Sequence, residues 1–406
     1  MRIGITICED IWTEDYLDRP LYNRDPVSEL SEQGIDLMLN LSASPFHLGK
    51  PELRRSMIGA IARKNRMPVV YCNAIGGQDQ LVFDGHSLVV GPNGRIIEQF
   101  PGFNESCKVV DPFDSKQEDD VLHGCDASQL YHALVLGLRD YAHKSGFFSA
   151  CLGLSGGIDS ALVAAIAVEA LGAQHVHGVS MPSRYSSEGS RTDAAALASA
   201  LGIDLQTISI EPAFEAYLSM TQQSFAGKPP DLTEENLQSR VRGTTLMALS
   251  NKFGWMVLTT GNKSELAVGY FTLYGDSVGG FAVIKDLLKT TVYDLCRHIN
   301  KRSGREIISE VVITKPPSAE LRPDQRDDQS LPAYEVLDPI LELYVEQDRT
   351  AAEIIAMGFD DALVRRIARL VDMNEYKRRQ GAPGVRVSAK AFGKDRRLPI
   401  TNGYRG

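Results

Sequence analysis

The stretch Cys151-Leu-Gly-Leu-Ser-Gly-Gly-Ile-Asp-Ser-Ala-Leu162 decides the fold of the larger part of this chain. A short apolar run that ends at Leu154 is typical of a buried parallel strand. Ser155-Gly156-Gly157 then turns the chain, and apolar residues at helical spacing begin with Ile158. Glycines between a strand and a helix let the backbone approach a ligand closely, and the N-terminus of the helix favours an anion. The stretch therefore predicts a site for phosphate or pyrophosphate.

Two features of this loop narrow its chemistry. It contains no lysine, so it is not the G-x-x-x-x-G-K-[ST] loop of enzymes that transfer a γ-phosphate. It does contain Asp159, an acid where an anion is expected, which is favourable if Asp159 holds Mg²⁺ together with phosphate oxygens. An ordinary strand-turn-helix corner also explains Ser-Gly-Gly alone, but the full pattern S-G-G-x-D-S favours a nucleotide site. The loop resembles the pyrophosphatase loop of the N-type ATP pyrophosphatases, which are adenine nucleotide alpha hydrolase-like.

Strands and helices alternate after this loop, which predicts a doubly wound parallel sheet of the α/β class. The expected strands are 151–154, 175–181, 204–210 and 256–260, and the expected helices are 160–171, 191–201 and 234–253. Helices at 333–346, 350–357 and 360–373 predict a helical C-terminal tail. Ligands of such sheets bind at the carboxyl ends of the strands.

The first 112 residues form a separate β-rich α/β segment in this interpretation. The expected elements are strands 2–8, 36–41 and 69–73, helix 51–66, and a hairpin of 86–91 with 95–100. A polar linker is expected at 113–125, and an amphipathic helix at 126–145 opens the second domain, 126–406.

The composition excludes several classes of protein. With 406 residues, of which 43% are hydrophobic, the chain can build two or three domains with cores. A net charge of −9 argues against a nucleic-acid partner, and no apolar run is long enough for a membrane span. The six cysteines are scattered without a C-x-x-C pair, which argues against zinc or disulfides. We therefore expect a cytoplasmic protein.

Cys8 stands at the tip of the first predicted strand and is a candidate nucleophile. A lone cysteine is more often inert packing, but its surroundings favour a functional role. The string Ile7-Cys-Glu-Asp-Ile-Trp12, with Asn40-Leu-Ser-Ala-Ser-Pro-Phe-His47 and Gly49-Lys50 downstream, resembles the glutamine amidotransferase domain of the nitrilase superfamily, an αββα fold. The resemblance implies that Cys8 attacks the amide of glutamine, and that Ser44 and Lys50 hold the glutamine substrate.

The segment departs from that family in one respect. The family site also needs a glutamate and a lysine well before the cysteine, and only seven residues precede Cys8. We therefore expect a partial domain in which Cys8 lacks its base, and which does not by itself hydrolyse glutamine efficiently. Such a fragment is also expected to expose a sheet face or edge.

A second group of motifs follows the pyrophosphate loop. It consists of Asn236-Leu-Gln-Ser-Arg-Val-Arg242, Thr259-Thr-Gly-Asn-Lys-Ser-Glu265, Tyr270-Phe-Thr-Leu-Tyr-Gly-Asp276, Lys285-Asp-Leu-Leu-Lys-Thr-Thr291 and Glu375-Tyr-Lys-Arg-Arg-Gln-Gly-Ala-Pro-Gly384. Together with the S-G-G-x-D-S loop, these strings resemble the NAD synthetase family. The resemblance implies ATP-dependent amidation of deamido-NAD through an adenylate, with ATP and Mg²⁺ bound, glutamine or ammonia as nitrogen source, and a homodimer or higher homo-oligomer.

The resemblance also assigns residues to each ligand. ATP is assigned to Gly153, Leu154, Ser155, Gly156, Gly157, Ile158, Asp159, Ser160 and Thr260. Deamido-NAD is assigned to Asn236, Arg240, Glu265, Asp276, Lys289 and Lys377. Mg²⁺ is assigned to Asp159 and Glu265.

Several alternatives stay open at this point. Arg240 and Arg242 are alternatively surface cations of a helix, Lys289 an unimportant cation in a first turn, and Glu265 an acid that favours a helix dipole. For the whole chain, the alternatives are another amidotransferase ligase with the same loop, such as a GMP- or asparagine-forming enzyme, and a nucleotide-binding module without catalytic activity.

Overall fold

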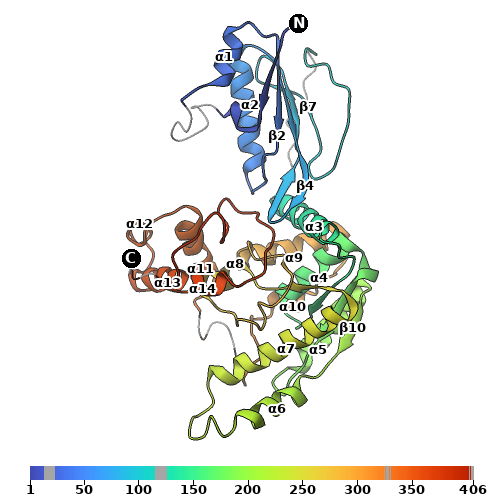
Figure 1. The fold of residues 1–406 in the computed structure, drawn as a ribbon, viewed down its shortest axis with the longest axis vertical. Coiled ribbons are helices and arrows are strands. Elements are labelled where there is room, and N and C mark those ends of the chain that lie inside the picture. The colour runs from blue at the N-terminus through green and yellow to red at the C-terminus, as the bar shows by residue number, and fades with distance from the viewer. Residues whose placement is uncertain are drawn as a thin grey trace. The chain divides into compact units, whose positions relative to one another are not determined.

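The structure, a computed structural model, describes residues 1–12, 23–114, 126–323, 325, 329, 331–401 and 403. It divides into two compact units, Met1–Gly137 and Leu138–Gly406, with the division inside helix α3 (Asp126–Lys144). Each unit contains its own five-stranded sheet (Figure 1). Of the predicted linker 113–125, residues 115–125 lie outside the described part of the chain.

The sheet of the first unit has the strand order β1-β2-β3-β6-β7. β1, β2 and β3 are parallel, whereas β6 pairs antiparallel with both β3 and β7. These strands are β1 (Ile3–Ile7), β2 (Leu37–Ser42), β3 (Val69–Asn73), β6 (Leu88–Val90) and β7 (Ile96–Gln99). The predicted strands and hairpin are confirmed. A further hairpin of β4 (Ile75–Gln78) and β5 (Leu81–Asp84) is not predicted, because Gly76 and Gly77 weaken its strand signal.

Helices cover one face of this sheet. Val27 of α1 (Pro26–Glu32) and Met57 of α2 (Lys50–Asn65) pack in one core with Met38 of β2. Outward-facing side chains of β1 are apolar but uncovered: Ile3, Ile5 and Ile7 are 46%, 61% and 64% exposed. β1 is also an edge strand, so the expectation of an exposed sheet face or edge is confirmed, and this surface favours self-association.

The second unit contains five parallel strands in the order β10-β9-β8-β11-β12. They are β8 (Ala150–Gly153), β9 (Val176–Ser180), β10 (Asp204–Thr207), β11 (Met256–Thr259) and β12 (Phe281–Ala282). The predicted doubly wound sheet is confirmed, with β12 as an addition. The strand order reverses between β8 and β11, and in open α/β sheets ligands bind at the carboxyl ends of the strands at such a point.

Crossover connections join the parallel strands of the second unit, and because such connections are almost always right-handed, helices are expected on both faces of the sheet. α4 (Ile158–Leu171) and α5 (Glu188–Leu201) follow β8 and β9, and α7 (Leu232–Phe253) precedes β11. Val241 of α7 packs on Cys151 and Val257 of the strands. α6 (Glu211–Thr221) lies beside α7 (Figure 1). The remaining helices before the tail are α8 (Lys263–Val268), α9 (Lys289–Ser303) and α10 (Glu310–Thr314).

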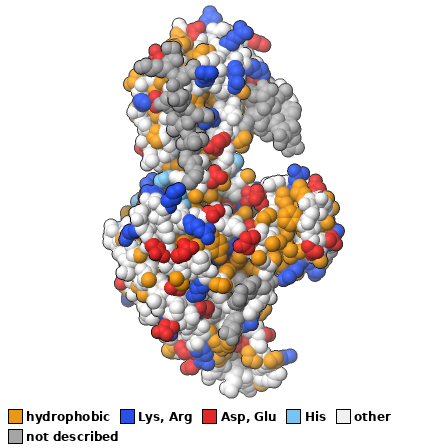
Figure 2. Space-filling model, turned by 180° about the vertical axis from the view of Figure 1, so that it is seen from behind, with side chains coloured by type: hydrophobic (Ala, Val, Ile, Leu, Met, Phe, Trp, Pro, Cys, Tyr) orange, Lys and Arg blue, Asp and Glu red, His pale blue; other side chains and the backbone are white. Residues whose placement is uncertain are grey.

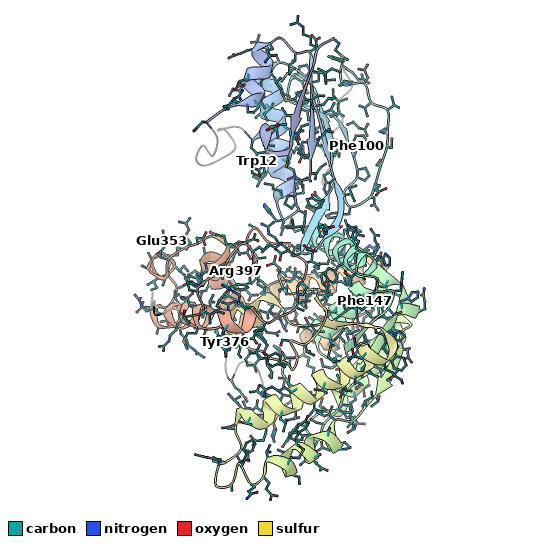
Figure 3. All side chains as sticks on the ribbon, viewed as in Figure 1. Trp12, Phe100, Phe147, Glu353, Tyr376 and Arg397 are labelled. Atoms are coloured by element: carbon teal, nitrogen blue, oxygen red, sulfur yellow. The ribbon has the colours of Figure 1, made fainter. Side chains whose placement is uncertain are left out.

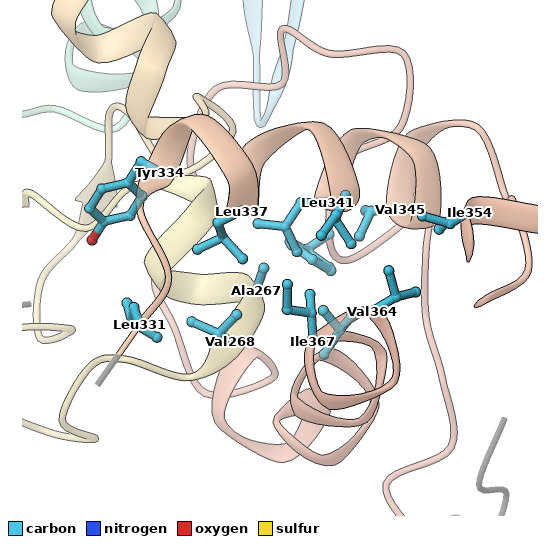
Figure 4. Packing of buried hydrophobic residues seen from close by; sticks show 13 residues of the cluster. Ala267, Val268, Leu331, Tyr334, Leu337, Leu341, Val345, Ile354, Val364 and Ile367 are labelled. Atoms are coloured by element: carbon cyan, nitrogen blue, oxygen red, sulfur yellow. The ribbon is translucent and has the colours of Figure 1, made fainter. Parts of the chain in front are cut away.

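The C-terminal tail is helical, as predicted. It consists of α11 (Tyr334–Leu341), a π-helical turn (Glu342–Glu346), α12 (Ala351–Ala356), α13 (Asp361–Met373) and α14 (Glu375–Arg378). Leu337 and Leu341 of α11 share a buried cluster with Ala267 of α8 and Val364 of α13 (Figure 4). The tail is therefore docked directly on α8, which follows β11 at the point where the strand order reverses.

Several helices differ from the sequence prediction, and α5 and α6 show the physical reasons. α5 begins at Glu188 rather than at 191, because Ser187 Oγ accepts a 3.1 Å hydrogen bond from Ser190 N and caps the helix. α6 is not predicted, since Phe214 is its single buried residue and its apolar face is correspondingly thin.

Two observations concern the surface and the length of the helices. Within the described ranges, no helix is both long and apolar enough to cross a membrane. On the face drawn in Figure 2, basic and acidic side chains are interspersed, so this face is not uniformly basic.

Candidate active site

The loop between β8 and α4 is organised by its own serines. Ser155 Oγ accepts a 3.2 Å hydrogen bond from Gly157 N and lies 3.2 Å from Ser160 Oγ. Ser160 Oγ in turn donates to Gly157 O at 2.9 Å. Gly157 is the N-cap of α4 and offers no side chain to the first-turn N–H groups. The N-terminus of α4 is thus an uncapped, positively polarised end at the carboxyl edge of the sheet, which suits a phosphate.

Glycine is required at position 156 for two reasons. Its φ of +77° lies in the left-handed region, and a Cβ there would overlap the carbonyl oxygen of Ser190. The close approach of these two backbones brings the start of α5 beside the loop. By contrast, Leu154 and Ile158 are buried, so only their backbone atoms are available to a nucleotide.

Asp159, in the first turn of α4, contacts side chains from two other segments. Its Oδ1 accepts a 2.9 Å hydrogen bond from Asn262 Nδ2, and its Oδ2 forms an ion pair with Lys289 Nζ. Glu265 Oε1 lies 3.5 Å from the same Lys289 Nζ. The structure therefore brings together three residues that the sequence assigned to the synthetase site, namely Asp159, Glu265 and Lys289.

Lys289 is buried, with 1% exposure, and opens α9. Burial opposes its charge, but the carboxylates of Asp159 and Glu265 outweigh this effect and raise its pKa. The lysine is therefore a permanent cation between two carboxylates. Its burial and pairing argue against the alternative of an unimportant cation in a first turn.

The donor set fits a hard cation that also binds phosphate. Asp159 and Glu265 come from different segments and converge on one ammonium group, so both carboxylates face the same small region. In the described part of the chain, no group of three or more His, Cys, Asp or Glu residues forms a complete metal cage. Mg²⁺ does not need one, because it is commonly held by one or two carboxylates, substrate phosphates and water.

A second group of predicted residues surrounds the segment after α8. Thr272 Oγ1 donates a 2.7 Å hydrogen bond to Asn236 Oδ1, and Asp276 Oδ1 accepts from Thr272 N at 2.8 Å. Arg240 Nε donates to Leu273 O at 3.2 Å. The side chains of Asn236, Arg240 and Asp276 therefore meet at one loop, as a common substrate site requires.

Lys377 of α14 binds the same loop from the tail. Its Nζ donates to Gly269 O at 2.8 Å and to Phe271 O at 2.9 Å, and burial lowers its pKa more than nearby Asp276 raises it. Tyr376, the residue before Lys377 on α14, marks this helix in Figure 3. Arg242 is not a free surface cation: its Nε donates to Met181 O at 3.0 Å, and burial lowers its pKa to about 10.

Thr260 and Gly153 occupy the strand ends next to these groups. Gly153 is the last residue of β8, and Thr260 directly follows β11. Both are half-buried at the position where the order of the strands reverses. Their backbone atoms therefore lie at the edge of the sheet where a nucleotide is expected.

The predicted amidotransferase residues lie in the first unit. Cys8 has a φ of +49°, which is uncommon for a residue with a side chain, at the junction of β1 and a 3-10 turn (Cys8–Ile11). Ser44 is buried, and its backbone N donates to Asn73 Oδ1 at 2.8 Å. Lys50 opens α2 and places its Nζ 5.0 Å from the ring centroid of Trp12. The strained backbone at Cys8 is typical of functional positions.

The sequence interpretation missed two groups of residues. One is Asn262, which carries a capping signature, N-x-x-E before a helix, and whose side chain also bonds Asp159. In the first unit, Arg54 Nη2 binds Asp84 at 2.6 and 2.7 Å, and His86 Nδ1 lies 2.6 Å from Asp84. No sequence signal indicates this buried triad, because its members come from separate elements.

Comparison with known proteins places both units in characterised families. The NAD synthase family model matches residues 130–381, and the carbon-nitrogen hydrolase family model matches residues 1–111. The chain is 49% identical to the glutamine-dependent NAD(+) synthetase of Synechocystis sp. over 411 residues, and 47% identical to that of Thermotoga maritima over 442 residues. These alignments cover 100% of this chain and 73% and 75% of the two relatives.

A solved structure shows the same similarity. The glutamine-dependent NAD+ synthetase from Acinetobacter baumannii, in complex with ADP, is 45% identical and superposes with a TM-score of 0.73. The match covers 99% of this chain and 72% of that chain. The chain thus spans about three quarters of the length of these relatives.

Proposed function

The chain belongs to the family of glutamine-dependent NAD(+) synthetases, and we propose that it amidates deamido-NAD to NAD with ATP, releasing AMP and pyrophosphate. The observation that carries this proposal is the convergence of Asp159, Glu265 and Lys289 beside the uncapped N-terminus of α4. That arrangement provides anion-binding N–H groups, a buried cation and two carboxylates at the carboxyl ends of β8 and β11. Cleavage of ATP between its α- and β-phosphates needs these groups.

In the first step, the nicotinate carboxylate of deamido-NAD attacks the α-phosphorus of ATP. A new P–O bond forms the adenylate, and the bond to pyrophosphate breaks. We propose that the first-turn N–H groups of α4, with the hydroxyl of Ser155, hold the leaving pyrophosphate, while Ser160, whose hydroxyl donates to Gly157 O, fixes the shape of the loop. The ammonium group of Lys289 offsets the negative charge that develops on it.

Asp159 and Glu265 are the residues that would hold Mg²⁺. When bound, the ion neutralises phosphate charge and orients the nucleotide. In its absence, Lys289 supplies the counter-charge to both carboxylates.

In the second step, ammonia attacks the adenylated carboxyl carbon, AMP leaves with the electron pair of the broken C–O bond, and a proton is released. Asn236, Arg240, Asp276 and Lys377 are proposed to hold deamido-NAD in position. Their convergence on the segment after α8 supports this role.

We propose further that free ammonia supplies the nitrogen more efficiently than glutamine in this chain. In the described part of the chain Cys8 is a free cysteine, and its backbone carbonyl is the group that Asn40 Nδ2 contacts, at 3.4 Å. A cysteine that attacks an amide needs an adjacent general base, and none is assigned beside Cys8. Equal rates of NAD formation from glutamine and from ammonium at matched concentrations would contradict this part of the proposal.

One assay tests the synthetase proposal. The protein is incubated with ATP, Mg²⁺, deamido-NAD and ammonium, and AMP and NAD are followed. We expect both products in equal amounts, their loss in Asp159→Ala, and their retention in Cys8→Ala. Absence of AMP would refute the proposal and favour a nucleotide-binding module. AMP formed with another carboxylate acceptor, and not with deamido-NAD, would identify a different amidotransferase ligase.

The assembly and location of the protein are also proposals. We propose a homodimer or larger homo-oligomer in the cytoplasm. Apolar side chains on α6 and next to it support an interface in this region: Tyr217, Met220 and Leu232 are 42%, 75% and 67% exposed. Light scattering coupled to size-exclusion chromatography would contradict the oligomer if it gave a single mass equal to that of one chain.

A further inference from the structure

Asp338 is a buried carboxylate on α11, outside the residues assigned above. It is 2% exposed. Its Oδ1 accepts a 2.6 Å hydrogen bond from Ser264 Oγ, and its Oδ2 accepts from Thr290 N at 2.8 Å and from Thr290 Oγ1 at 2.9 Å. One side chain of the tail thus joins the first turn of α8 to the first turn of α9, which are separate segments of the chain.

Both segments carry residues of the candidate active site. Ser264 immediately precedes Glu265, and Thr290 immediately follows Lys289. Ser264 Oγ also accepts a 2.9 Å hydrogen bond from Lys289 N. A continuous series of hydrogen bonds therefore runs from Asp338 through Ser264 to the backbone of Lys289. The segments that carry Glu265 and Lys289 are therefore both held by the carboxylate of Asp338.

The helix that carries Asp338 is itself immobilised. Leu337 and Leu341, on either side of Asp338, are 0% and 1% exposed and share a cluster with Ala267 and Val268 of α8 (Figure 4). Tyr334, one helical turn before Asp338, lies with its ring centroid 5.4 Å from Lys289 Nζ. Residues four apart share one face of a helix, so α11 presents Tyr334 and Asp338 together to the first turn of α9, where Lys289 and Thr290 lie.

A carboxylate in such a position is costly unless its hydrogen bonds are made. Burial raises the pKa of Asp338, while the donors Ser264 and Thr290 favour its charged form. A leucine would fill this helix face without that cost. The hydrogen bonds of Asp338 end on the two segments that present Glu265 and Lys289. This indicates that Asp338 serves the candidate active site rather than the packing of the core.

We propose that Asp338 is a positioning residue of the synthetase site, which holds Lys289 and Glu265 in the geometry that receives the phosphates of the nucleotide. The inference rests on the proposed function for the identity of the reaction. Its central prediction, however, concerns nucleotide affinity and does not require NAD to be formed.

The test compares the full chain with its Asp338→Asn variant, which keeps the size of the side chain but turns one acceptor into a donor facing Thr290. ADP is titrated calorimetrically in the presence of Mg²⁺, and the Mg²⁺ dependence of ADP binding is measured separately. We expect ADP affinity to fall about 10- to 100-fold, the range typical of residues that orient ligating side chains. The Mg²⁺ concentration for half-maximal binding should rise in parallel.

A matched control is Asp372→Asn. Asp372 belongs to the same tail, on α13, and its carboxylate accepts from Tyr344 Oη at 3.0 and 3.1 Å and lies 3.9 Å from Arg396 Nη2, both of which also belong to the tail. We expect this variant to bind ADP within about twofold of the unmodified chain. A purely structural role of Asp338 would lower the fraction of binding-competent protein and leave the dissociation constant unchanged, which calorimetric stoichiometry distinguishes.

A second variant tests the same series of bonds if Asp338→Asn does not fold. Ser264→Ala removes the link to Lys289 from the other end, and we expect it to weaken ADP binding in the same direction. The double variant should lose no more ADP affinity than the weaker-binding of the two single variants, because both changes break one series of bonds. Fully additive effects, or unchanged ADP affinity in the folded variants, would overturn the inference.

The two proposals fail in different ways. If the unmodified chain binds ADP but forms no NAD, the proposed function is wrong, and the ADP affinities of the variants still decide the role of Asp338. If the unmodified chain forms NAD and Asp338→Asn equals it in rate and affinity, the function stands and the positioning role is wrong.

Discussion

Asn262 Nδ2 donates a 2.9 Å hydrogen bond to Asp159 Oδ1 and thereby ties the loop after β11 to the first turn of α4. The same side chain caps α8, since Asn262 Oδ1 accepts from Glu265 N at 3.0 Å. One buried amide thus sets the orientation of Asp159 and the start of the helix that presents Glu265. Both carboxylates of the proposed Mg²⁺ site depend on it.

Replacing Asn262 separates these two roles. Asn262→Ala should lower stability by about 0.5–2 kcal/mol through the lost cap, and should also reduce NAD formation. Asn262→Ser keeps an oxygen for the cap but is too short to reach Asp159. We expect it to recover most of the thermal stability and little of the activity. Full recovery of activity in the serine variant would show that the bond to Asp159 is dispensable.

Gly156→Ala should strain the backbone of the pyrophosphate loop and should also displace the start of α5. A left-handed alanine costs roughly 1–2 kcal/mol, and its Cβ also overlaps Ser190 O, so the start of α5 must move. Gly202→Ala is the control, because Gly202 has a φ of +69° with open space around it. Urea unfolding and the KM for ATP are measured for both. Gly202→Ala should lose stability only, whereas equal KM values in both variants would argue against a role for the close approach.

The buried pair of Asp84 and Arg54 should make the stability of the first unit depend on pH. Burial raises the pKa of Asp84, but the hydrogen bond from His86 and the charge of Arg54 outweigh burial and lower it. Because the folded pKa lies below the unfolded one, this stabilisation is present above the unfolded pKa and is lost as the pH falls through the folded pKa. Asp84→Asn should therefore cost about 3–5 kcal/mol at neutral pH by leaving Arg54 unpaired.

The measurement uses Trp12 as the reporter of the first unit. The chain has two tryptophans, Trp12 and Trp255, so a Trp255→Phe background isolates the signal. We expect the difference between the parent and Asp84→Asn to be constant from neutral pH down to about pH 5 and to shrink below about pH 4. The control Asp36→Asn, at an exposed carboxylate, should change stability by about 1 kcal/mol or less. A difference that grows as the pH falls would contradict the assigned direction.

The exposed face of β1 should limit solubility. Ile5→Lys places a charge among Ile3, Ile7 and Leu41, which are all about half exposed or more, and charges on edge strands oppose strand-to-strand association. We expect less light scattering at high protein concentration and a change in stability within about 0.5 kcal/mol. Met357→Lys, at an exposed apolar residue of the tail, adds the same charge elsewhere. If both variants reduce scattering equally, net charge rather than the β1 face is responsible.

The sequence alone was sufficient for most strands, most of the longer helices and the pyrophosphate loop, because these depend on local patterns. A period of two or 3.6 residues, a glycine pair and a capping serine or asparagine are read within a few positions of one another. The doubly wound order followed because alternating strands and helices admit few topologies. Asp159, Glu265 and Lys289 were assigned from motifs, and the structure brings them together.

Tertiary structure alone decided which charges are paired and which segments hold them. Asn262 bonds Asp159 across 103 positions of sequence, and Asp338 bonds Ser264 across 74. The partners of Arg54 and Asp84 are likewise 30 positions apart. No local pattern encodes such contacts, because they exist only once the sheet and the tail have packed and excluded water. The S-G-G-x-D-S loop therefore indicates a nucleotide site from the sequence alone. The packing of α8, α9 and α11 determines how the carboxylates and the lysine of that site are held.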